Sequence, residues 1–219
     1  MEVKLLTYTP LAEYVCAKAA AMCRGKEPGP ETLERAIKSG HLSVAEHASF
    51  TFEIRGISRA CMAQLTRHRM ASFSVESQRA VRMTDLPSMC VVPESITRTG
   101  IDVRPILGEL QRLYEMMVCA GVPREDARYI LPEAASTSLV VTMNARELRH
   151  FFSLRCCNRA QWEIRQLADR MLELSRCAAP ALFADAGAPC QCGMPCPEAR
   201  PCGHPRSEED NDQMALETL

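Results

Sequence analysis

The chain has 219 residues, enough for one large domain with a substantial core or for a domain with an appendage. Its 26 Lys and Arg residues balance 27 Asp and Glu residues, so the net charge does not attract nucleic acid or a membrane, and anion recognition is expected to be local. The sequence shows no secretory signal and no long uncharged apolar run. We therefore expect a cytoplasmic protein whose twelve cysteines are reduced or bind a metal.

Three helices and two strands are expected in the N-terminal third. In chain order they are a strand at 2–8, a helix at 10–25, a helix at 30–39, a strand at 49–56 and a helix at 58–68. Thr9 followed by Pro10 is typical of an N-cap and a first helical residue, and Gly40 is typical of a helix end. The strict alternation of apolar and polar residues in SFTFEIRG makes this strand the clearest in the chain.

A basic segment follows the helix expected at 58–68. This helix would place Gln64, Arg67 and His68 on one face, at spacings of three and four residues. The stretch RHRMASFSVESQR, residues 67–79, then runs into a loop rich in arginine and serine. Guanidinium forks and serine hydroxyls suit a phosphomonoester or a diphosphate, while a solvated basic face is the simpler interpretation of such a charge run.

Helices dominate the rest of the chain. The expected elements are a short strand at 89–93, a helix at 104–120, a short helix from 123 that ends before Pro132, a buried strand at 138–144, a helix at 144–155 and a helix at 160–183. Two helices have predicted core stripes, one through Ile106, Leu110, Leu113 and Met117 and one through Ile164, Leu167, Met171, Leu174 and Ala178. Long helices with a few mostly non-consecutive strands predict the α+β class.

The helix expected at 144–155 begins with a recognisable cap. Asn144 is a favoured N-cap residue, and Glu147 three residues later makes the start close to a capping box. Arg146 and His150 then share one face of this helix. A helix start also favours bound anions, so a capping role and a ligand role for Asn144 are compatible.

The last part of the chain changes abruptly in composition. Residues 187–206 are rich in Cys, Pro and Gly, and the acidic residues 207–219 are expected to be disordered. Thiolates and imidazole bind zinc, and the candidates for a zinc site are Cys190, Cys192, Cys196 and Cys202, with His204 nearby. Their spacing is not a pair of CxxC knuckles, and a reduced, loosely ordered extension is the alternative.

The basic segment resembles the signature of the flavin-dependent thymidylate synthases, the ThyX family. Arg-His-Arg is followed, after seven residues, by Ser77, Gln78 and Arg79. The upstream stretch GHLSVAEHASFTFEIRGISRACMAQLTRHR and the downstream stretches PREDARYILP, VVTMNARELRHF and LRCCNRAQWEIRQLA resemble further family blocks in order. The likeness covers about residues 1–185 and implies a synthase domain at 1–186, with helices packed on a small, mostly antiparallel sheet.

The resemblance also implies an activity. Members transfer a methylene group from methylenetetrahydrofolate to carbon 5 of dUMP, reduced FAD supplies the hydride that completes the methyl group of dTMP, and NADPH reduces the flavin again. The protein then needs mainly positioning and positive charge. A homotetramer with active sites shared between subunits is expected, and neither nucleic acid nor a membrane is an expected partner.

Site residues follow from the resemblance position by position. Those expected to bind dUMP are Gln64, Leu65, Thr66, Arg67, Val75, Glu76, Ser77, Gln78, Arg79, Arg128 and Arg155. Those expected to bind FAD are His41, Ser43, Glu46, Arg67, His68, Arg69, Val75, Asn144, Ala145, Arg146 and His150. Arg128 would reach the phosphate, from another subunit, and Arg155 would be catalytic by stabilising negative charge on the pyrimidine. The family usually carries Glu or Gln where this chain has Val75, with the acid shifted to Glu76.

Simpler interpretations exist beside this one. The arginine cluster and the cysteines could form an RNA- or phosphate-binding module with a zinc knuckle, although four Tyr, six Phe and one Trp leave little for base stacking. His41, Glu46 and His47 could be ligands of a metallohydrolase, but their spacing is not HExxH. Cys156 and Cys157 are expected to pack in a helix, because the flavin route needs no enzyme thiolate.

Overall fold

The structure is a computed structural model, and it describes residues 1–206. The acidic tail expected at 207–219 lies outside the described residues. Two compact units divide the chain. Unit 1 comprises Met1–Glu2, Ile54–Arg67 and Phe73–Val140, and unit 2 comprises Val3–Glu53, His68–Ser72 and the chain from Val141 onward.

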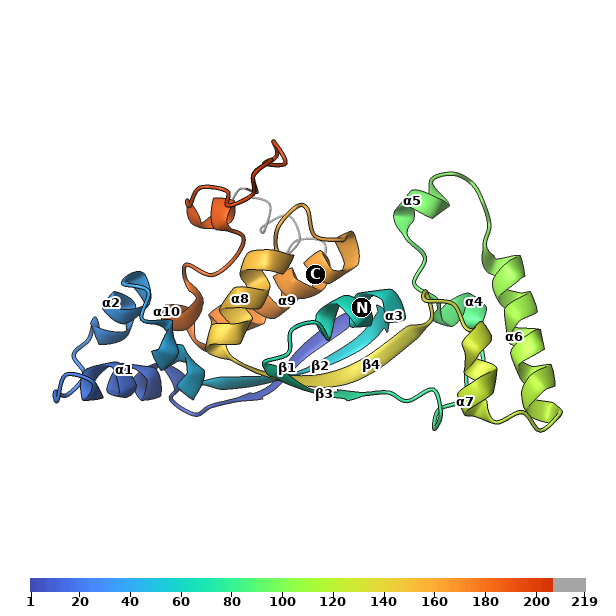
Figure 1. The fold of residues 1–219 in the computed structure, drawn as a ribbon, viewed down its shortest axis with the longest axis horizontal. Coiled ribbons are helices and arrows are strands. Elements are labelled where there is room, and N and C mark those ends of the chain that lie inside the picture. Colours follow the sequence, from blue (N-terminus) through green and yellow to red (C-terminus); the bar gives the residue numbers. More distant parts are fainter. Residues whose placement is uncertain (207–219) are drawn as a thin grey trace. The chain divides into compact units, whose positions relative to one another are not determined.

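Four strands form one small antiparallel sheet, so the α+β class is confirmed (Figure 1). The strands are β1 (Glu2–Tyr8), β2 (Ser49–Ser58), β3 (Ala71–Val75) and β4 (Ser136–Asn144), in the spatial order β1-β2-β4-β3. Phe50, Phe52 and Ile54 on β2 are fully buried, as their alternation predicts. On the neighbouring strand β4 every second residue is buried.

Aromatic rings carry much of the core of unit 2. Phe183 lies 5.2 Å from Phe50 and 6.0 Å from Phe152 between ring centroids, both edge to face. Tyr8 stacks on Phe50 at 5.7 Å. These contacts hold two helices, α8 (Ala145–Arg155) and α10 (Pro180–Phe183), against the sheet.

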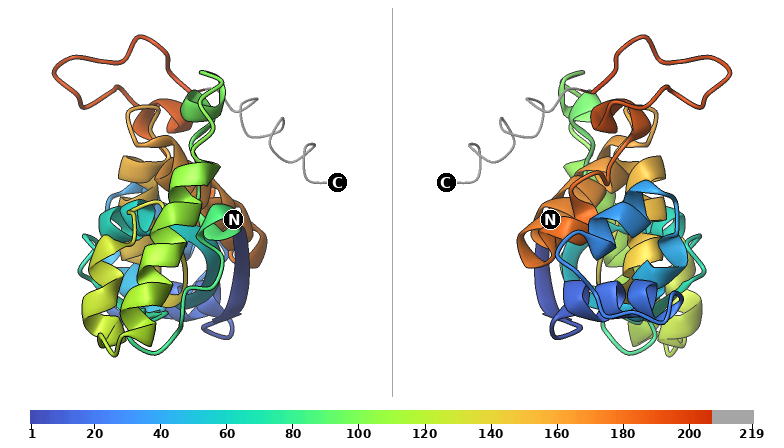
Figure 2. Two further views of the ribbon diagram at one scale, coloured as in Figure 1. Left: turned by 90° about the vertical axis from the view of Figure 1, so that its right-hand side faces the viewer. Right: turned by 90° about the vertical axis from the view of Figure 1, so that its left-hand side faces the viewer.

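The helices of unit 2 surround this core. They are α1 (Ala12–Met22), α2 (Thr32–Lys38), the 3-10 helix η1 (Leu42–His47), α8 (Ala145–Arg155), α9 (Trp162–Ala178), α10 (Pro180–Phe183) and the 3-10 helix η3 (Pro189–Cys192). Helix α8 packs against η1 and α9, and α1 packs against α2 and η1 (Figures 1 and 2). The short helix η1 is therefore central to this unit.

The first helix begins two residues later than the sequence predicts. Thr9 does not cap it, because its hydroxyl accepts a hydrogen bond from the backbone N–H of Ser49 at 2.9 Å and continues the pairing of β1 with β2. Leu11 takes the N-cap position in the left-handed region, with φ 51°. Strand pairing thus overrides the local capping signal of Thr9 and Pro10.

The last long helix is also shorter than predicted. It ends at Ala178, because Ala179 adopts φ −150° and ψ 72° ahead of Pro180, and a residue before proline avoids the helical region. Its buried face holds Ile164, Leu167 and Met171 as predicted. Leu174 and Ala178 are only half-buried, and the other buried positions are Glu163, Ala168, Leu172 and Ser175.

Unit 1 has its own apolar core. Its helices are α3 (Arg59–Leu65), α4 (Leu86–Met89), α5 (Glu94–Thr97), α6 (Arg104–Cys119), α7 (Arg124–Ala127) and the 3-10 helix η2 (Arg128–Ile130). Helix α6 packs against α4 and α7 (Figure 2). The core cluster comprises Met83, Leu86, Leu107, Tyr114, Ala127 and Ala135.

Of two predictions about unit 1, one is half right and the other is wrong. In the stripe predicted for α6, Leu110 and Met117 pack against the core cluster, but Ile106 is 59% exposed and Leu113 is 43% exposed, whereas Leu107 and Tyr114 are buried. Amphipathic spacing alone could not distinguish these neighbouring faces. The segment 89–93 forms a single bridge, between Cys90 and Ala135, in place of a strand.

The basic segment differs most from its prediction. Helix α3 ends at Leu65, so Arg67 and His68 lie beyond it and do not share its face with Gln64. Residues expected to form a loop instead form β3, which ends at Val75. Pairing of this edge strand with β4 accounts for the difference, and sequence alternation in ASFSV gave only a weak signal for it.

Candidate functional site

The N-terminal end of α8 is the first element of the candidate site. Asn144 closes β4, and its side-chain oxygen accepts a hydrogen bond from the Glu147 N–H at 2.9 Å, which confirms the predicted cap. Ala145 is fully buried and donates its N–H to the Ala48 carbonyl at 2.7 Å. The helix therefore starts at a fixed place, with the positive end of its dipole toward Asn144.

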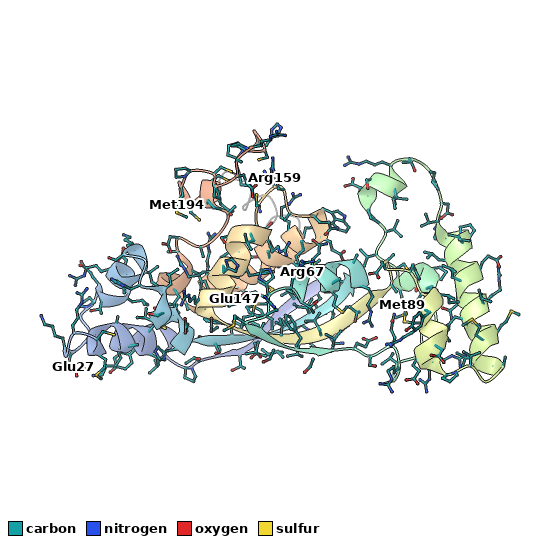
Figure 3. The ribbon with its side chains drawn as sticks, in the orientation of Figure 1. Glu27, Arg67, Met89, Glu147, Arg159 and Met194 are labelled. Carbon is teal, nitrogen blue, oxygen red and sulfur yellow. The ribbon has the colours of Figure 1, made fainter. Side chains whose placement is uncertain are left out.

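A cavity of about 590 Å³ lies against this helix. It gathers four of the expected flavin residues, Glu46, Asn144, Arg146 and His150. The other lining residues are Leu42, Met70, Glu147, Arg149, Ser153, Asp185, Ala186, Gly187 and Met194. Figure 3 labels two of them, Glu147 on α8 and Met194 in the C-terminal extension.

The cavity contains arginines with acidic partners. Arg146 pairs with Glu46. Arg149 donates to Asp185 and to the Leu182 carbonyl, each at 2.7 Å, while its Nε is a buried donor without a partner among residues 1–206. Partial burial alone would raise the pKa of Asp185, but the hydrogen bond and charge of Arg149 outweigh it and lower the pKa.

Two further expected flavin residues lie on the other side of η1. His41 and Ser43 line a second cavity of about 480 Å³, between η1 and the helices α1 and α2. Arg24, Lys26 and Arg35 give this cavity a basic lining. Because η1 contributes residues to both cavities, it is the element that an extended ligand would have to cross.

His68, Glu147 and Arg155 form a hydrogen-bonded row in unit 2. His68 is 5% exposed, and its Nδ1 lies 3.0 Å from Oε1 of Glu147. The Nε of Arg155, the last residue of α8, donates to Nε2 of His68 at 3.1 Å. Arginine is only a donor, so Nε2 must accept and Nδ1 must carry the proton that is donated to Glu147.

Burial keeps this histidine neutral. Desolvation lowers the pKa of His68, the hydrogen bond that His68 donates to Glu147 opposes that shift, and the charge of Arg155 lowers the pKa further. Phe151 packs edge to face on the ring at 4.9 Å. The neutral ring therefore holds the Arg155 guanidinium in a fixed orientation. Arg69, next along the chain, is exposed.

Unit 1 holds the second half of the basic signature. Ser77 and Arg79 line a cavity of about 400 Å³ together with Ala80, Pro123, Arg124 and Glu125. Arg79 pairs with Glu125 through its Nε at 2.8 Å, and its N–H donates to the Ser77 hydroxyl at 3.2 Å. Arg124 donates to the Ala80 carbonyl at 2.8 Å. Two cationic side chains and a hydroxyl thus converge, as an anion site requires.

The remaining expected nucleotide residues are spread along α3, β3 and η2. Leu65 is buried, Arg67 is exposed, and Arg128 donates from Nε to the Glu125 carbonyl at 3.0 Å. Gln64, Thr66, Val75 and Gln78 are half-buried. Thr66 donates its hydroxyl to the Met62 carbonyl at 3.1 Å, a local helix bond rather than a ligand contact.

Glu76 makes its contacts in this structure through the backbone. Its N–H donates to the Ser138 carbonyl at 2.8 Å, and its carbonyl accepts from Nη2 of Arg59 at 2.9 Å. The pKa of Arg59 is lowered, chiefly because its guanidinium is partly buried. The Nε of Arg59 is buried and has no hydrogen-bond partner among the described residues. Arg59 was not singled out from the sequence, where it is one more arginine at a helix start.

Other residues of the site also escaped sequence reasoning. Arg149 and Ser153 follow Arg146 at spacings of three and seven, so the face that carries Arg146 and His150 could have been extended to them. Glu125 lies within the block that contains Arg128, but no local pattern pairs it with Arg79. Long-range contacts of this kind require the fold.

Residues 1–206 contain no group of three or more His, Cys, Asp or Glu side chains placed to hold a metal ion. The expected zinc candidates Cys190, Cys192, Cys196 and Cys202 are therefore not gathered into a site, and neither are His41, Glu46 and His47. Cys202 instead accepts from the N–H of His204 at 3.4 Å. Within the same residues no helix is long and apolar enough to cross a membrane.

Known proteins resemble this chain along most of its length. The family described as "Thymidylate synthase complementing protein" matches residues 4–181. A flavin-dependent thymidylate synthase of Geobacter sulfurreducens is 47% identical over 213 residues, which cover 90% of this chain and 91% of that protein. Another, from Clostridium tetani, is 39% identical and covers 93% of each chain.

Solved structures show the same similarity. The ThyX of Helicobacter pylori, complexed with FAD and dUMP, superposes with a TM-score of 0.66 at 28% identity, covering 85% of this chain and all of that one. A UMP/dUMP methylase of Streptomyces cacaoi superposes with a TM-score of 0.72 at 24% identity, covering 84% and 93%. The second likeness concerns the fold alone.

Proposed function

The chain belongs to the flavin-dependent thymidylate synthases, and on that premise we propose how its residues divide the work of converting dUMP to dTMP. The alternative, an RNA- or phosphate-binding module with a zinc knuckle, has no support from these matches. The observation that carries the proposal is the gathering of Glu46, Asn144, Arg146 and His150 around one cavity.

We propose that this cavity holds FAD. Arg146 and Arg149 offer charge for a diphosphate, the start of α8 offers its dipole, and the unpartnered Nε of Arg149 is a donor that a ligand oxygen would satisfy. His41 and Ser43 extend the site across η1 into the second cavity. When bound, FAD supplies the hydride chemistry, which no side chain of the protein can provide.

The nucleotide phosphate belongs to the cluster of Ser77 and Arg79. Arg79 is paired with Glu125, so a phosphate dianion has to displace that carboxylate, and the stronger charge of the dianion favours the exchange. Arg124 lines the same cavity and can contribute a further N–H. Arg128 is proposed to reach the phosphate from another subunit, with Gln64, Gln78 and Arg67 holding the rest of the nucleotide.

Arg155 is proposed as the catalytic residue. A guanidinium aimed at the pyrimidine stabilises the negative charge that develops as carbon 5 becomes nucleophilic. Its direction must be set before the substrate reacts, and the neutral ring of His68 does this by accepting its N–H. Protonated His68 would offer a second donor in place of the acceptor, and the orientation would be lost.

Further parts of the proposal rest on the family resemblance. Methylenetetrahydrofolate is the proposed carbon donor, and NADPH is the proposed source of reducing equivalents. A homotetramer with shared active sites is proposed as the working assembly. The cytoplasmic location stays a prediction.

Replacing Arg155 tests the catalytic assignment. Arg155→Ala should bind FAD with an unchanged visible spectrum yet lose dTMP formation by about a hundredfold or more, the typical effect of removing one transition-state charge partner. Arg112→Ala, at an exposed arginine of α6, is the matched control. Normal turnover by Arg155→Ala would remove Arg155 from the mechanism, whereas a parent protein that never binds flavin would remove the whole proposal.

A further inference from the structure

The C-terminal extension, residues 187–206, is docked on the segment that follows the catalytic candidate. The family match ends at residue 181, so this extension lies outside it. Asn158 donates its amide to the His204 carbonyl at 2.7 Å. Arg159, labelled in Figure 3, donates to the Arg200 carbonyl and lies 3.7 Å from Glu198. These contacts join Glu198, Arg200 and His204 to the segment that follows α8.

Arg206 makes the most buried of these contacts. Its side chain is 5% exposed, and its Nη1 lies 2.7 and 2.9 Å from the carboxylate oxygens of Asp169, which is 9% exposed. The same Nη1 donates to the Cys156 carbonyl at 2.8 Å. A buried arginine is tolerated only where charge and hydrogen bonds compensate its desolvation, and Asp169 and Cys156 provide both.

The contact with Cys156 bears directly on Arg155. Cys156 is the C-cap of α8, and its N–H donates to the Phe152 carbonyl at 3.0 Å. Carbonyls at a helix C-terminus lack partners within the helix, and a cation there is favourable. By holding the Cys156 carbonyl, Arg206 fixes the last turn of α8, which carries Arg155.

The other end of the extension reaches the flavin cavity. Gly187 and Met194 line that cavity. Gly187 has φ 143°, and a Cβ there would lie 2.8 Å from Oε1 of Gln191, a buried residue that accepts from the Ala188 N–H. One continuous segment thus contributes to the cavity wall and to the support of Arg155.

We propose that Arg206 is a positioning residue for Arg155. This inference rests on the catalytic role proposed for Arg155. Arg206 touches no reacting atom. It acts through the Cys156 carbonyl on the final turn of α8.

The test compares Arg206→Ala with the parent and with Arg200→Ala, a change at an exposed arginine of the same extension. Loss of alignment at a reacting group lowers the rate by up to about a hundredfold. We expect kcat for dTMP formation to fall about tenfold or more in Arg206→Ala, with KM for dUMP and the flavin spectrum close to the parent. Arg206→Lys, which keeps the charge, should recover part of the loss.

A double variant separates positioning from stability. Arg206→Met with Asp169→Leu removes both buried charges, and such replacements are often neutral or stabilising. Arg206→Ala leaves the buried Asp169 without its cation and should lower the thermal midpoint of unfolding. The double variant should restore this midpoint but leave kcat low, because Arg206 no longer holds the Cys156 carbonyl. Full recovery of kcat in the double variant, or unchanged kcat in Arg206→Ala, would overturn the inference.

Amide hydrogen exchange provides a readout that does not depend on turnover. In Arg206→Ala the amides of residues 153–157 should exchange faster than in the parent, with or without bound flavin, while Arg200→Ala should match the parent. Unchanged exchange would overturn the inference. If Arg155→Ala turned over normally while exchange responded to Arg206, the catalytic assignment would fail and the structural link would stand.

Discussion

Replacing His68 by glutamine should reduce the dependence of folding stability on pH. In the folded protein the pKa of His68 lies below its ordinary value of about 6.5, chiefly because the ring is buried, with the charge of Arg155 adding to the shift. As the pH falls through 6.5, the unfolded chain binds a proton at His68 that the folded chain does not. The unfolded state is then favoured, so stability present above about pH 6.5 is lost as the pH falls toward the lowered folded pKa.

The size of the effect follows from linkage. One proton bound by the unfolded state alone gives a slope of at most about 1.4 kcal/mol per pH unit. His68 is 5% exposed and its ring faces Glu147, Arg155, His150 and Phe151, so solvent screening does little to reduce this limit.

Urea unfolding without added ligand measures the slope. The parent should lose stability between about pH 7.5 and 5.5 more steeply than His68→Gln. His150→Gln, at an exposed histidine of α8, should keep the slope of the parent. Equal slopes for the parent and His68→Gln would refute a neutral, buried His68 and, with it, the account of how Arg155 is oriented.

Two further predictions concern substrate and core. Arg79→Ala should raise KM for dUMP about tenfold to a hundredfold in steady-state assays, which is the range for a lost hydrogen bond to a charged group. Glu125→Gln should leave KM unchanged or lower it, because the competing carboxylate is gone. An unchanged KM in Arg79→Ala would contradict the phosphate assignment. Phe183→Ala should lower the free energy of unfolding by about 3–5 kcal/mol in urea titrations, because the Phe183 ring is fully buried between Phe50 and Phe152. A loss below about 1 kcal/mol would show that these three rings do not form a unit of the core.

Local signals identified the parts of the fold that depend on local chemistry. The cap at Asn144 and the alternating residues of β2 were predicted because the responsible atoms lie within a few residues of one another. The cap predicted at Thr9 failed for the opposite reason. Its hydroxyl is used by Ser49, forty residues away, and no local pattern reveals that partner.

The same distinction holds for the candidate site. Glu46, Arg146 and His150 were expected near the flavin through family resemblance, and the cavity at α8 brings them together. The residues that orient Arg155, and the carboxylate that pairs with Arg79, were not foreseen. Glu147 was recognised only as part of a cap, and Arg206 lies in the Cys-, Pro- and Gly-rich segment, for which only a zinc site or a loosely ordered extension was expected.

The most direct test of the central claim is the affinity for FAD of Arg146→Ala, measured by flavin fluorescence against the parent and against Arg98→Ala, an exposed arginine of unit 1. Loss of one charge-assisted contact in the α8 cavity should weaken FAD binding about tenfold or more. Arg98→Ala should bind as the parent does. If Arg146→Ala bound FAD as tightly as both, the cavity at the start of α8 would not be the flavin site.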